Sequence, residues 1–154
     1  MGLKLDLPGI STHLGCFGTG ADRCNPGGYK PLVSPQERVL MAARVEGLDG
    51  VELQYPMMFV DSDPVEMKQF LQETNVACSI VSVSVWDDAS WSMGSLCHPD
   101  IEVRRLAVRA ILDGVAVSKT LGANKINLWL GQDGFDYPFQ VNYRAAIDWG
   151  WWTG

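Results

Sequence analysis

The stretch from Trp91 to Phe139, WSMGSLCHPDIEVRRLAVRAILDGVAVSKTLGANKINLWLGQDGFDYPF, decides the fold. Apolar residues recur from Ile101 to Leu121 at the spacing of one helical face, and Gly122 suits the end of such a helix. The apolar run Lys125–Leu130 that follows has the length of a strand. A long helix joined to a strand by a short turn predicts one unit of an alternating α/β fold.

The same alternation runs through the rest of the chain. Further strands are expected at Gly9–Phe17, Val51–Gln54 and Ala77–Val85. Helices are expected from Ser34-Pro35 through Glu46 with Gly47 as the end, from Asp63-Pro64 onward, and from near Asn142 to Gly150. A capping side chain followed by proline is typical of a helix start. The pattern predicts parallel βα units in one domain, residues 1–149, followed by an atypical tail, residues 150–154.

The length limits how much of such a fold is present. The chain has 154 residues, whereas a closed (βα)8 barrel takes about 250. We therefore expect four strands that form about half of a barrel. The tail places Trp151 and Trp152 between glycines. Our favoured interpretation is a shifted reading frame or an artificial end, and the alternative is that both indoles cover an open barrel edge.

Composition excludes several classes of partner. The net charge of −6 argues against nucleic acid or an anionic membrane surface. The sequence has no run near the roughly 20 apolar residues of a membrane span and no signal-peptide pattern at Met1–Asp6, so a cytoplasmic protein is expected. The four cysteines include no Cys-x-x-Cys pair, and we expect small apolar fillers rather than a zinc site.

Functional groups of a parallel α/β barrel lie at the carboxyl ends of its strands and in the loops that follow. That rule selects His13 and Phe17 from the first strand, Glu52 and Gln54 from the second, Trp86, Asp87 and Asp88 from the third, and Trp129, Gln132, Asp133 and Asp136 from the fourth. The glycine-containing loop at residues 15–20 matches no phosphate-binding spacing, and we expect a flexible substrate loop.

Each candidate has a structural alternative. His13 is either a functional group or a hydrogen-bonded core residue, and His98, before Pro99, is expected to cap a helix. Trp86 and Trp129 either stack on the apolar face of a sugar ring or plug the end of the core.

The acidic candidates have alternatives of their own. Glu52 is either a buried acid or an ion-pair partner in the lumen. The aspartate pairs Asp87-Asp88 and Asp133/Asp136 could supply metal oxygens or be solvated turn residues. The sequence offers no convincing set of three or more ligands, so we expect no metal site in this chain.

At these residues the chain resembles the xylose-isomerase-like TIM-barrel superfamily. The resemblance is carried by residues 93–96, 102–105 and 121–123 and by Trp129–Gly134, in the order found in xylose isomerases. Gly131–Gln140 is similar to bacterial proteins named as sugar isomerases. The superfamily also includes sugar epimerases, inosose dehydratases and endonuclease IV. The resemblance covers nearly the whole chain but only the first half of the family's barrel.

The resemblance also implies site residues. Trp129 occupies the position of the tryptophan that walls the sugar site, and Phe17 stands near an aromatic at the end of the first strand. Two departures argue against a true xylose isomerase: Asp87-Asp88 and Gln54 stand where that enzyme has histidines. The family's metal ligands come from the fifth to eighth strands, which are not in this sequence.

The sequence thus predicts the first half of a metal-dependent aldose–ketose isomerase. This half would contribute sugar contacts through His13, Phe17, Gln54, Trp86 and Trp129. The resemblance implies Mn²⁺, Mg²⁺ or Co²⁺ in the complete barrel but no cofactor in this chain, whose own catalytic residues we do not assign. The alternative is a non-catalytic sugar-binding or oligomeric half-barrel, with an epimerase or dehydratase less favoured and DNA repair disfavoured. Open strand edges predict a homo-oligomer, with Trp151 and Trp152 at or near the contact.

Overall fold

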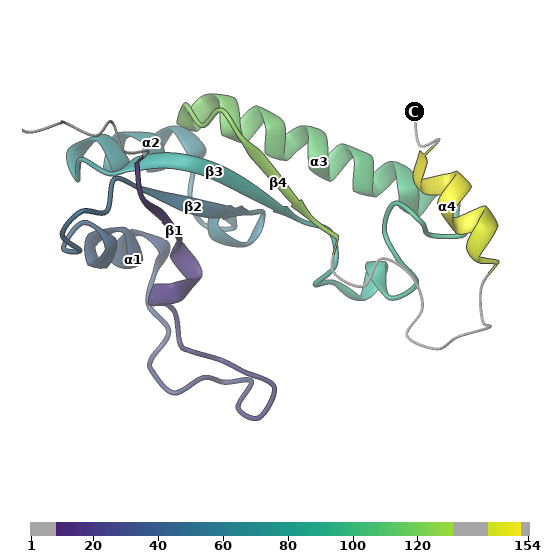
Figure 1. Cartoon of the computed structure of the whole chain (residues 1–154), viewed down its shortest axis with the longest axis horizontal. Helices are drawn as coiled ribbons and strands as arrows, with labels where there is room; N and C mark the ends of the chain where they lie inside the picture. The colour runs from purple at the N-terminus through teal and green to yellow at the C-terminus, as the bar shows by residue number, and fades with distance from the viewer. Residues whose placement is uncertain (1–8, 131–141, 152–154) are drawn as a thin grey trace, which may run out of the picture.

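A computed structural model describes residues 9–130 and 142–151 of the chain (Figure 1). Its strands are β1 (Ser11–His13), β2 (Gly50–Tyr55), β3 (Ala77–Ser84) and β4 (Ile126–Trp129). Its α-helices are α1 (Pro35–Ala42), α2 (Pro64–Glu73), α3 (Ile101–Leu121) and α4 (Tyr143–Trp151), and short 3-10 helices are η1 (Leu14–Phe17), η2 (Met57–Phe59) and η3 (Ala89–Trp91).

The four strands form one parallel sheet in the order β1-β2-β3-β4. Each strand pairs with the next one along the chain, and a helix follows each of the first three, which is the connectivity of an α/β barrel. The predicted half-barrel of parallel βα units is therefore confirmed.

The pairing of β2 with β3 contains one irregularity. Val51 lies opposite Cys78, but the next residue, Glu52, lies opposite Ile80. Ser79 is the extra residue of this bulge, and its hydroxyl donates to the Val51 carbonyl over 3.1 Å. Beyond the bulge the register is regular through Tyr55 opposite Val83.

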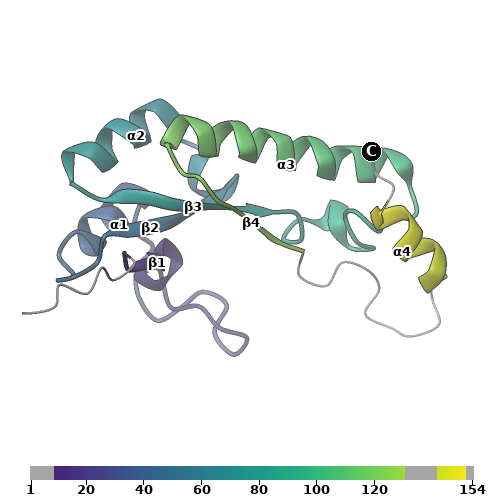
Figure 2. The same ribbon diagram turned by 45° about the horizontal axis from the view of Figure 1, so that its top comes forward.

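The two faces of the sheet differ in character. One alternate set of side chains is apolar and packs under the helices: Val51, Leu53, Val81 and Val83 are at most 1% exposed. The helices α2 and α3 lie together over this face (Figure 2). The core continues under them through Val39, Met67, Leu71, Val76, Val117 and Leu121. The opposite face, which would line the lumen of a closed barrel, carries the polar residues of the strands.

Capping side chains fix the helix starts as expected. Ser34 and Glu37 form a reciprocal capping box at the start of α1, in which the Ser34 N–H donates to Glu37 over 2.8 Å. Asp63 accepts from the Val65 N–H over 2.7 Å at the start of α2. The predicted end of α1 at Glu46 was wrong: the helix ends at Ala42, because the following N–H groups bond three residues back, as Val45 does to Ala42, and the chain becomes a series of turns.

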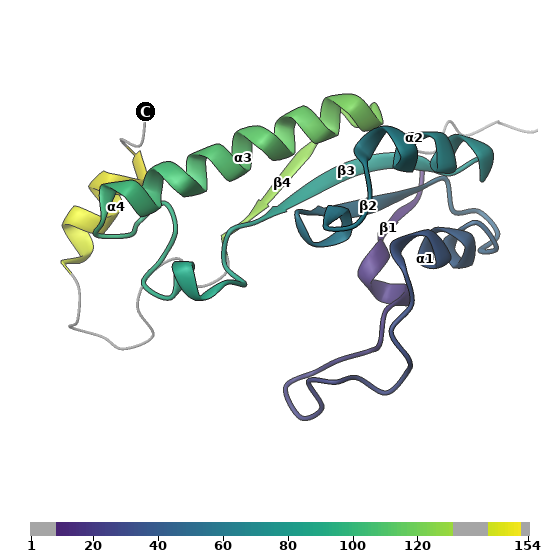
Figure 3. The ribbon, with the colours of Figure 1, turned by 180° about the vertical axis from the view of Figure 1, so that it is seen from behind.

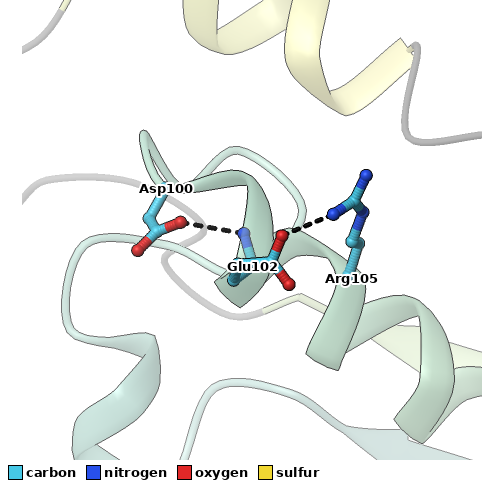
Figure 4. Close-up of polar contacts among 3 residues, drawn as sticks. All are labelled: Asp100, Glu102 and Arg105. Carbon is cyan, nitrogen blue, oxygen red and sulfur yellow. Dashed lines mark hydrogen bonds and ion pairs between the residues drawn. The ribbon is translucent and has the colours of Figure 1, made fainter.

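The start of α3 also differs from the prediction. Asp100, not His98, is the N-cap, and its carboxylate accepts from the Glu102 N–H over 2.8 Å, as Figure 4 shows beside the ion pair of Glu102 with Arg105. His98 lies two residues earlier, 6% exposed, and its Nδ1 accepts from the Asp100 N–H over 3.0 Å. His98 therefore holds the backbone of Asp100, the residue that caps the helix, through a hydrogen bond. Gly122 ends α3 with φ of 79°, as expected.

The first strand is shorter than predicted. The expected strand Gly9–Phe17 extends only over Ser11–His13, and the chain then coils into η1. The cause is local: His13 Nδ1 accepts from the Gly15 N–H over 3.0 Å and turns the backbone out of the sheet. Two of the cysteines also depart from expectation, since Cys16 and Cys24 are exposed and only Cys78 is buried.

The last helix, α4, lies beside the start of α3 (Figure 3). Arg104 of α3 is 8% exposed and lies over the Trp149 ring of α4, with its guanidinium carbon 5.2 Å from the ring centroid. The helix continues through Gly150 to Trp151, one residue past its expected end. Trp152 lies outside the described residues, and the boundary of the predicted tail stays a prediction. No helix among the described residues is long and apolar enough to cross a membrane.

Candidate functional site

A pocket of about 230 Å³ opens on the polar face of the sheet. All four strands contribute to it, mostly through their carboxyl halves. Its lining consists of His13, Glu52, Gln54, Ser82, Val83, Ser84, Trp86, Asn127 and Trp129. The pocket lies at the end of the sheet where parallel α/β proteins place their functional groups.

A carboxylate, a hydroxyl and an amide form a network across the floor of the pocket. The Ser82 hydroxyl donates to Glu52 Oε1. Asn127 Nδ2 donates to Ser82 Oγ over 2.9 Å and lies 3.4 Å from Glu52 Oε1. The three residues come from β2, β3 and β4, so the network ties neighbouring strands together. Since Glu52 accepts both donors, its carboxylate is oriented rather than free in the pocket.

A second polar pair lies one step closer to the mouth of the pocket. Gln54 Nε2 donates to Ser84 Oγ over 3.2 Å. Gln54 and Ser84 each follow the first network by two residues on the same strand, so they share its face of the sheet. The amide oxygen of Gln54 takes no part in that bond and is an acceptor that a ligand hydroxyl could use.

Two tryptophans form one wall of the pocket. Trp86 follows β3 and Trp129 ends β4, and their ring centroids lie 5.1 Å apart with the planes inclined by 47°. Trp86 is 42% exposed and Trp129 is 60% exposed. In the described part of the chain the two rings therefore form an accessible apolar surface beside the polar groups of the pocket.

The two residues predicted from the first strand lie in different places. His13 lines the pocket, with its Nδ1 held by the Gly15 N–H. Its Nε2 is the nitrogen left for a ligand. Phe17 does not line the pocket but packs against the hydrophobic core from η1. The structure thus brings together His13, Gln54, Trp86 and Trp129 and leaves Phe17 apart.

The aspartates that follow the third strand do not line the pocket. Asp88 caps η3, where its carboxylate accepts from the Ser90 hydroxyl over 2.6 Å and the Ser90 N–H over 2.8 Å. These two hydrogen bonds lower the pKa of Asp88 below its ordinary value. Asp87 and Asp88 are both exposed. The other loop candidates, Gln132, Asp133 and Asp136, lie outside the described residues.

The residues of the pocket do not suit a catalytic divalent metal. Among residues 9–130 and 142–151, no group of three or more His, Cys, Asp or Glu side chains is placed to hold a metal ion. In the pocket itself the only such groups are Glu52 and His13. Glu52 is engaged by Ser82 and Asn127, and His13 by Gly15.

Sequence reasoning missed three polar residues of the pocket: Ser82, Ser84 and Asn127. A signal for them existed, because they occupy alternate positions in otherwise apolar strands. Residues at alternate positions of a strand share one face. Serines two apart in Ala77–Val85 therefore predict a polar stripe on the face away from the helices.

Several known proteins resemble the chain in sequence or in fold. No protein-family model matches the chain. Over 92 residues it is 33% identical to a probable sugar isomerase of Mesorhizobium japonicum, a match that takes in 56% of this chain and 21% of that protein. A probable sugar isomerase of Rhizobium meliloti is 37% identical over 59 residues, 38% of this chain and 14% of that protein. The xylose isomerase of Thermus thermophilus is 28% identical over 82 residues, 53% of this chain and 21% of that enzyme.

A solved structure shares the fold. The AP endonuclease of family 2 from Brucella melitensis superposes with a TM-score of 0.62 and 17% identity, covering 94% of this chain and 47% of that one. At that identity the likeness concerns the fold alone. The matched regions span less than half the length of each of these proteins. The chain is thus similar in sequence to parts of proteins named as sugar isomerases and a xylose isomerase, and it shares its fold with half of an AP endonuclease of family 2.

Proposed function

We propose that this chain supplies the sugar-binding wall of an aldose–ketose isomerase. The observation that carries the proposal is the accessible Trp86–Trp129 pair beside a row of amide and hydroxyl groups. A sugar ring has an apolar face of C–H bonds and a rim of hydroxyls. The pocket offers an aromatic surface for the first and hydrogen-bonding groups for the second.

Each polar group has a defined task in this proposal. Gln54 presents an amide oxygen, and His13 presents Nε2, so both can bind sugar hydroxyls. Glu52 and Asn127 are held by their mutual contacts with Ser82, so they meet the ligand in fixed positions. Groups that are oriented before binding lose less conformational entropy when the ligand arrives.

The relatives include a xylose isomerase, which suggests a metal-dependent family. The described residues hold no cluster that fits such an ion. We therefore assign binding and orientation of the sugar to this chain and derive no catalytic step from it. Hydrogen transfer between neighbouring carbons of the sugar, and the metal that would polarise its oxygens, need groups beyond those described.

Binding of the open-chain or cyclic sugar is the direct test. Titration of the purified chain with D-xylose and other aldoses, followed by tryptophan fluorescence and ligand-observed NMR, should show saturable binding. Trp129→Ala should weaken it about 2- to 10-fold, because an aromatic contact contributes about 0.5–1.5 kcal/mol. Gln54→Ala should weaken it to a similar degree through the lost hydrogen bond.

Trp149→Phe is the matched control, because Trp149 lies on α4 against Arg104 and does not line the pocket. That variant should bind sugar as the parent chain does. Equal weakening by Trp129→Ala and Trp149→Phe would show a general loss of structure. Binding that survives Trp129→Ala unchanged would rule out the tryptophan wall as the sugar site.

A second candidate is a sugar-binding half-barrel without catalysis. The absence of a three-ligand cluster among the described residues favours it. An assay of aldose–ketose interconversion with added Mn²⁺, Mg²⁺ or Co²⁺ separates the two. Turnover by the chain would favour the enzyme, whereas saturable sugar binding without turnover at any metal concentration would favour the binding module.

A further inference from the structure

A hydrogen bond between His13 and Gly15 determines which nitrogen of the imidazole carries its hydrogen. The Gly15 N–H donates to His13 Nδ1 over 3.0 Å. A backbone N–H can only donate, so Nδ1 accepts and has no hydrogen of its own. A neutral imidazole has a single N–H, which must then lie on Nε2. Since His13 lines the pocket, its Nε2–H is a hydrogen-bond donor that a ligand could meet there.

The same geometry requires a residue without a side chain at position 15. A Cβ at Gly15 would lie 2.5 Å from both Cε1 and Nδ1 of His13, and the next atom, at 3.8 Å, is Nε2 of the same ring. Carbon atoms in ordinary contact lie about 3.5–4.0 Å apart. The backbone at Gly15 does not have the positive φ that favours glycine. The imidazole of His13 is therefore the group that a larger residue at this position would displace.

The donor on His13 lies beside an acceptor on the neighbouring strand. His13 is opposite Glu52 in the register of β1 with β2, and both side chains line the pocket. Glu52 accepts from the Ser82 hydroxyl through Oε1, which leaves Oε2 outside that bond. A hydroxyl group is both a donor and an acceptor, so one sugar hydroxyl can accept from the His13 Nε2–H and donate to Glu52.

From these observations we infer that Gly15 is a positioning residue that fixes His13 as a hydrogen-bond donor in the pocket. Its N–H holds the ring, and its lack of a side chain leaves room for the ring. The ligand must then present an oxygen lone pair to Nε2. This last step rests on the proposal that the pocket binds sugar, whereas the positioning of the ring does not.

Long-range ¹H–¹⁵N NMR of the full chain tests the positioning without any sugar, at about pH 8, where histidine is ordinarily neutral. The chain has two histidines, and His98 is an internal reference because its Nδ1 also accepts a backbone N–H. Both rings should carry their hydrogen on Nε2. Gly15→Ala should shift the resonances of His13 and leave those of His98 in place.

Gly27→Ala is the matched control, because Gly27 is exposed and the nearest atom to a Cβ there is Asn25 Oδ1 at 3.7 Å. This variant should leave the resonances of both rings unchanged. Hydrogen on Nδ1 of His13 would overturn the inference. A Gly15→Ala spectrum identical to that of the parent chain would overturn it as well.

Titration with D-xylose, followed by ligand-observed NMR, tests the consequence for binding. His13→Ala should weaken binding about 2- to 10-fold through the lost hydrogen bond. Gly15→Ala should weaken it to the same extent, but should add nothing in the His13→Ala background, because it acts through the ring. Further weakening in that background would overturn the inference.

Two remaining outcomes also have a defined meaning. A parent chain that binds no sugar contradicts the proposed function, and the imidazole spectra still decide whether Gly15 positions His13. If circular dichroism shows that Gly15→Ala does not fold, the variant in the His13→Ala background decides instead. A folded double variant supports the inference, since the clash with the ring is gone, and an unfolded one overturns it.

Discussion

Gly114 of α3 lies so close to Val83 of β3 that a Cβ at Gly114 would lie 2.4 Å from Val83 Cγ2. The absence of a side chain lets the helix rest directly on the strand that carries two of the pocket serines. We expect Gly114→Ala to lower the free energy of unfolding by about 1–2 kcal/mol. Overpacking costs about 1–3 kcal/mol, and the helix preference of alanine recovers at most about 1. Urea denaturation measures the difference.

The same substitution in a Val83→Ala background serves as the control. With the valine methyl groups gone, Gly114→Ala should be neutral or stabilising by up to about 1 kcal/mol. An unchanged cost in that background would show that Val83 is not the group that the new methyl meets.

The two serines of the pocket should differ in their contributions to stability. Ser82 donates to the Glu52 carboxylate, whereas Ser84 accepts from the neutral Gln54 amide. Hydrogen bonds to charged groups contribute about 1.5–3 kcal/mol and neutral ones about 0.5–1.5. Ser82→Ala should therefore lower the free energy of unfolding more than Ser84→Ala does. The reverse order, measured by thermal or urea denaturation, would contradict the stronger hydrogen bond assigned to Ser82.

Cys78 should resist thiol reagents that modify Cys16 and Cys24. Burial raises the pKa of the Cys78 thiol to about 11, with a smaller contribution from the nearby Glu52 carboxylate. Since the thiolate is the reactive form, iodoacetamide at pH 8 should label the exposed Cys16 and Cys24 first. Peptide mass spectrometry identifies the sites. Rapid labelling of Cys78 in the folded chain would contradict its burial.

The same pKa predicts how stability changes at high pH. The thiol ionises near pH 9 in the unfolded chain but near 11 in the folded chain, so its contribution is complete below pH 9 and is lost as the pH rises through 11. A shift of this size corresponds to about 2–3 kcal/mol. Cys78→Ala should make the unfolding free energy less dependent on pH between 9 and 11. Identical slopes in both proteins would argue against the raised pKa.

The capping box of α1 should make stability sensitive to acid. The backbone N–H and hydroxyl of Ser34 lower the pKa of Glu37 below its ordinary value of 4.5. A lowered pKa stabilises the folded chain above the unfolded value, and this contribution is lost as the pH falls through the folded value. Glu37→Gln should reduce the acid dependence below about pH 4.5. Ser34→Ala should cost about 1 kcal/mol at pH 7, as measured by thermal denaturation.

Much of the fold follows from patterns that the sequence shows directly. Alternating apolar runs and capped helices predict the parallel half-barrel, because each unit carries its own start and end signals. His13, Gln54, Trp86 and Trp129 meet in one pocket because the carboxyl ends of parallel strands share one edge. The early turn after His13 was not predictable in this way, since it depends on a side-chain bond to the Gly15 N–H rather than on hydrophobicity.

Other features depend on which face of its strand each side chain occupies, and composition does not reveal this. Ser82, Ser84 and Asn127 lie within apolar strands, and only their alternation identifies them as a polar stripe. Which face that stripe occupies depends on the register of β3 against β2. Phe17 was expected at the mouth of the pocket, but the turn into η1 directs it to the core.

The bulge at Ser79 fixes which side chains of β3 reach the pocket. If β3 kept Ser79 but paired with β2 without a bulge, Gln54 would lie opposite Val81 instead of Ser82. The valines of β3 would then line the lumen, and the serines would lie beneath the helices, since a one-residue slip exchanges the two faces of a strand. Removal of Ser79 would instead join Cys78 to Ile80 and leave Ser82 opposite Gln54 in a regular ladder. An insertion or deletion between Cys78 and Ile80 therefore preserves the pocket only when the bulge appears or disappears with it.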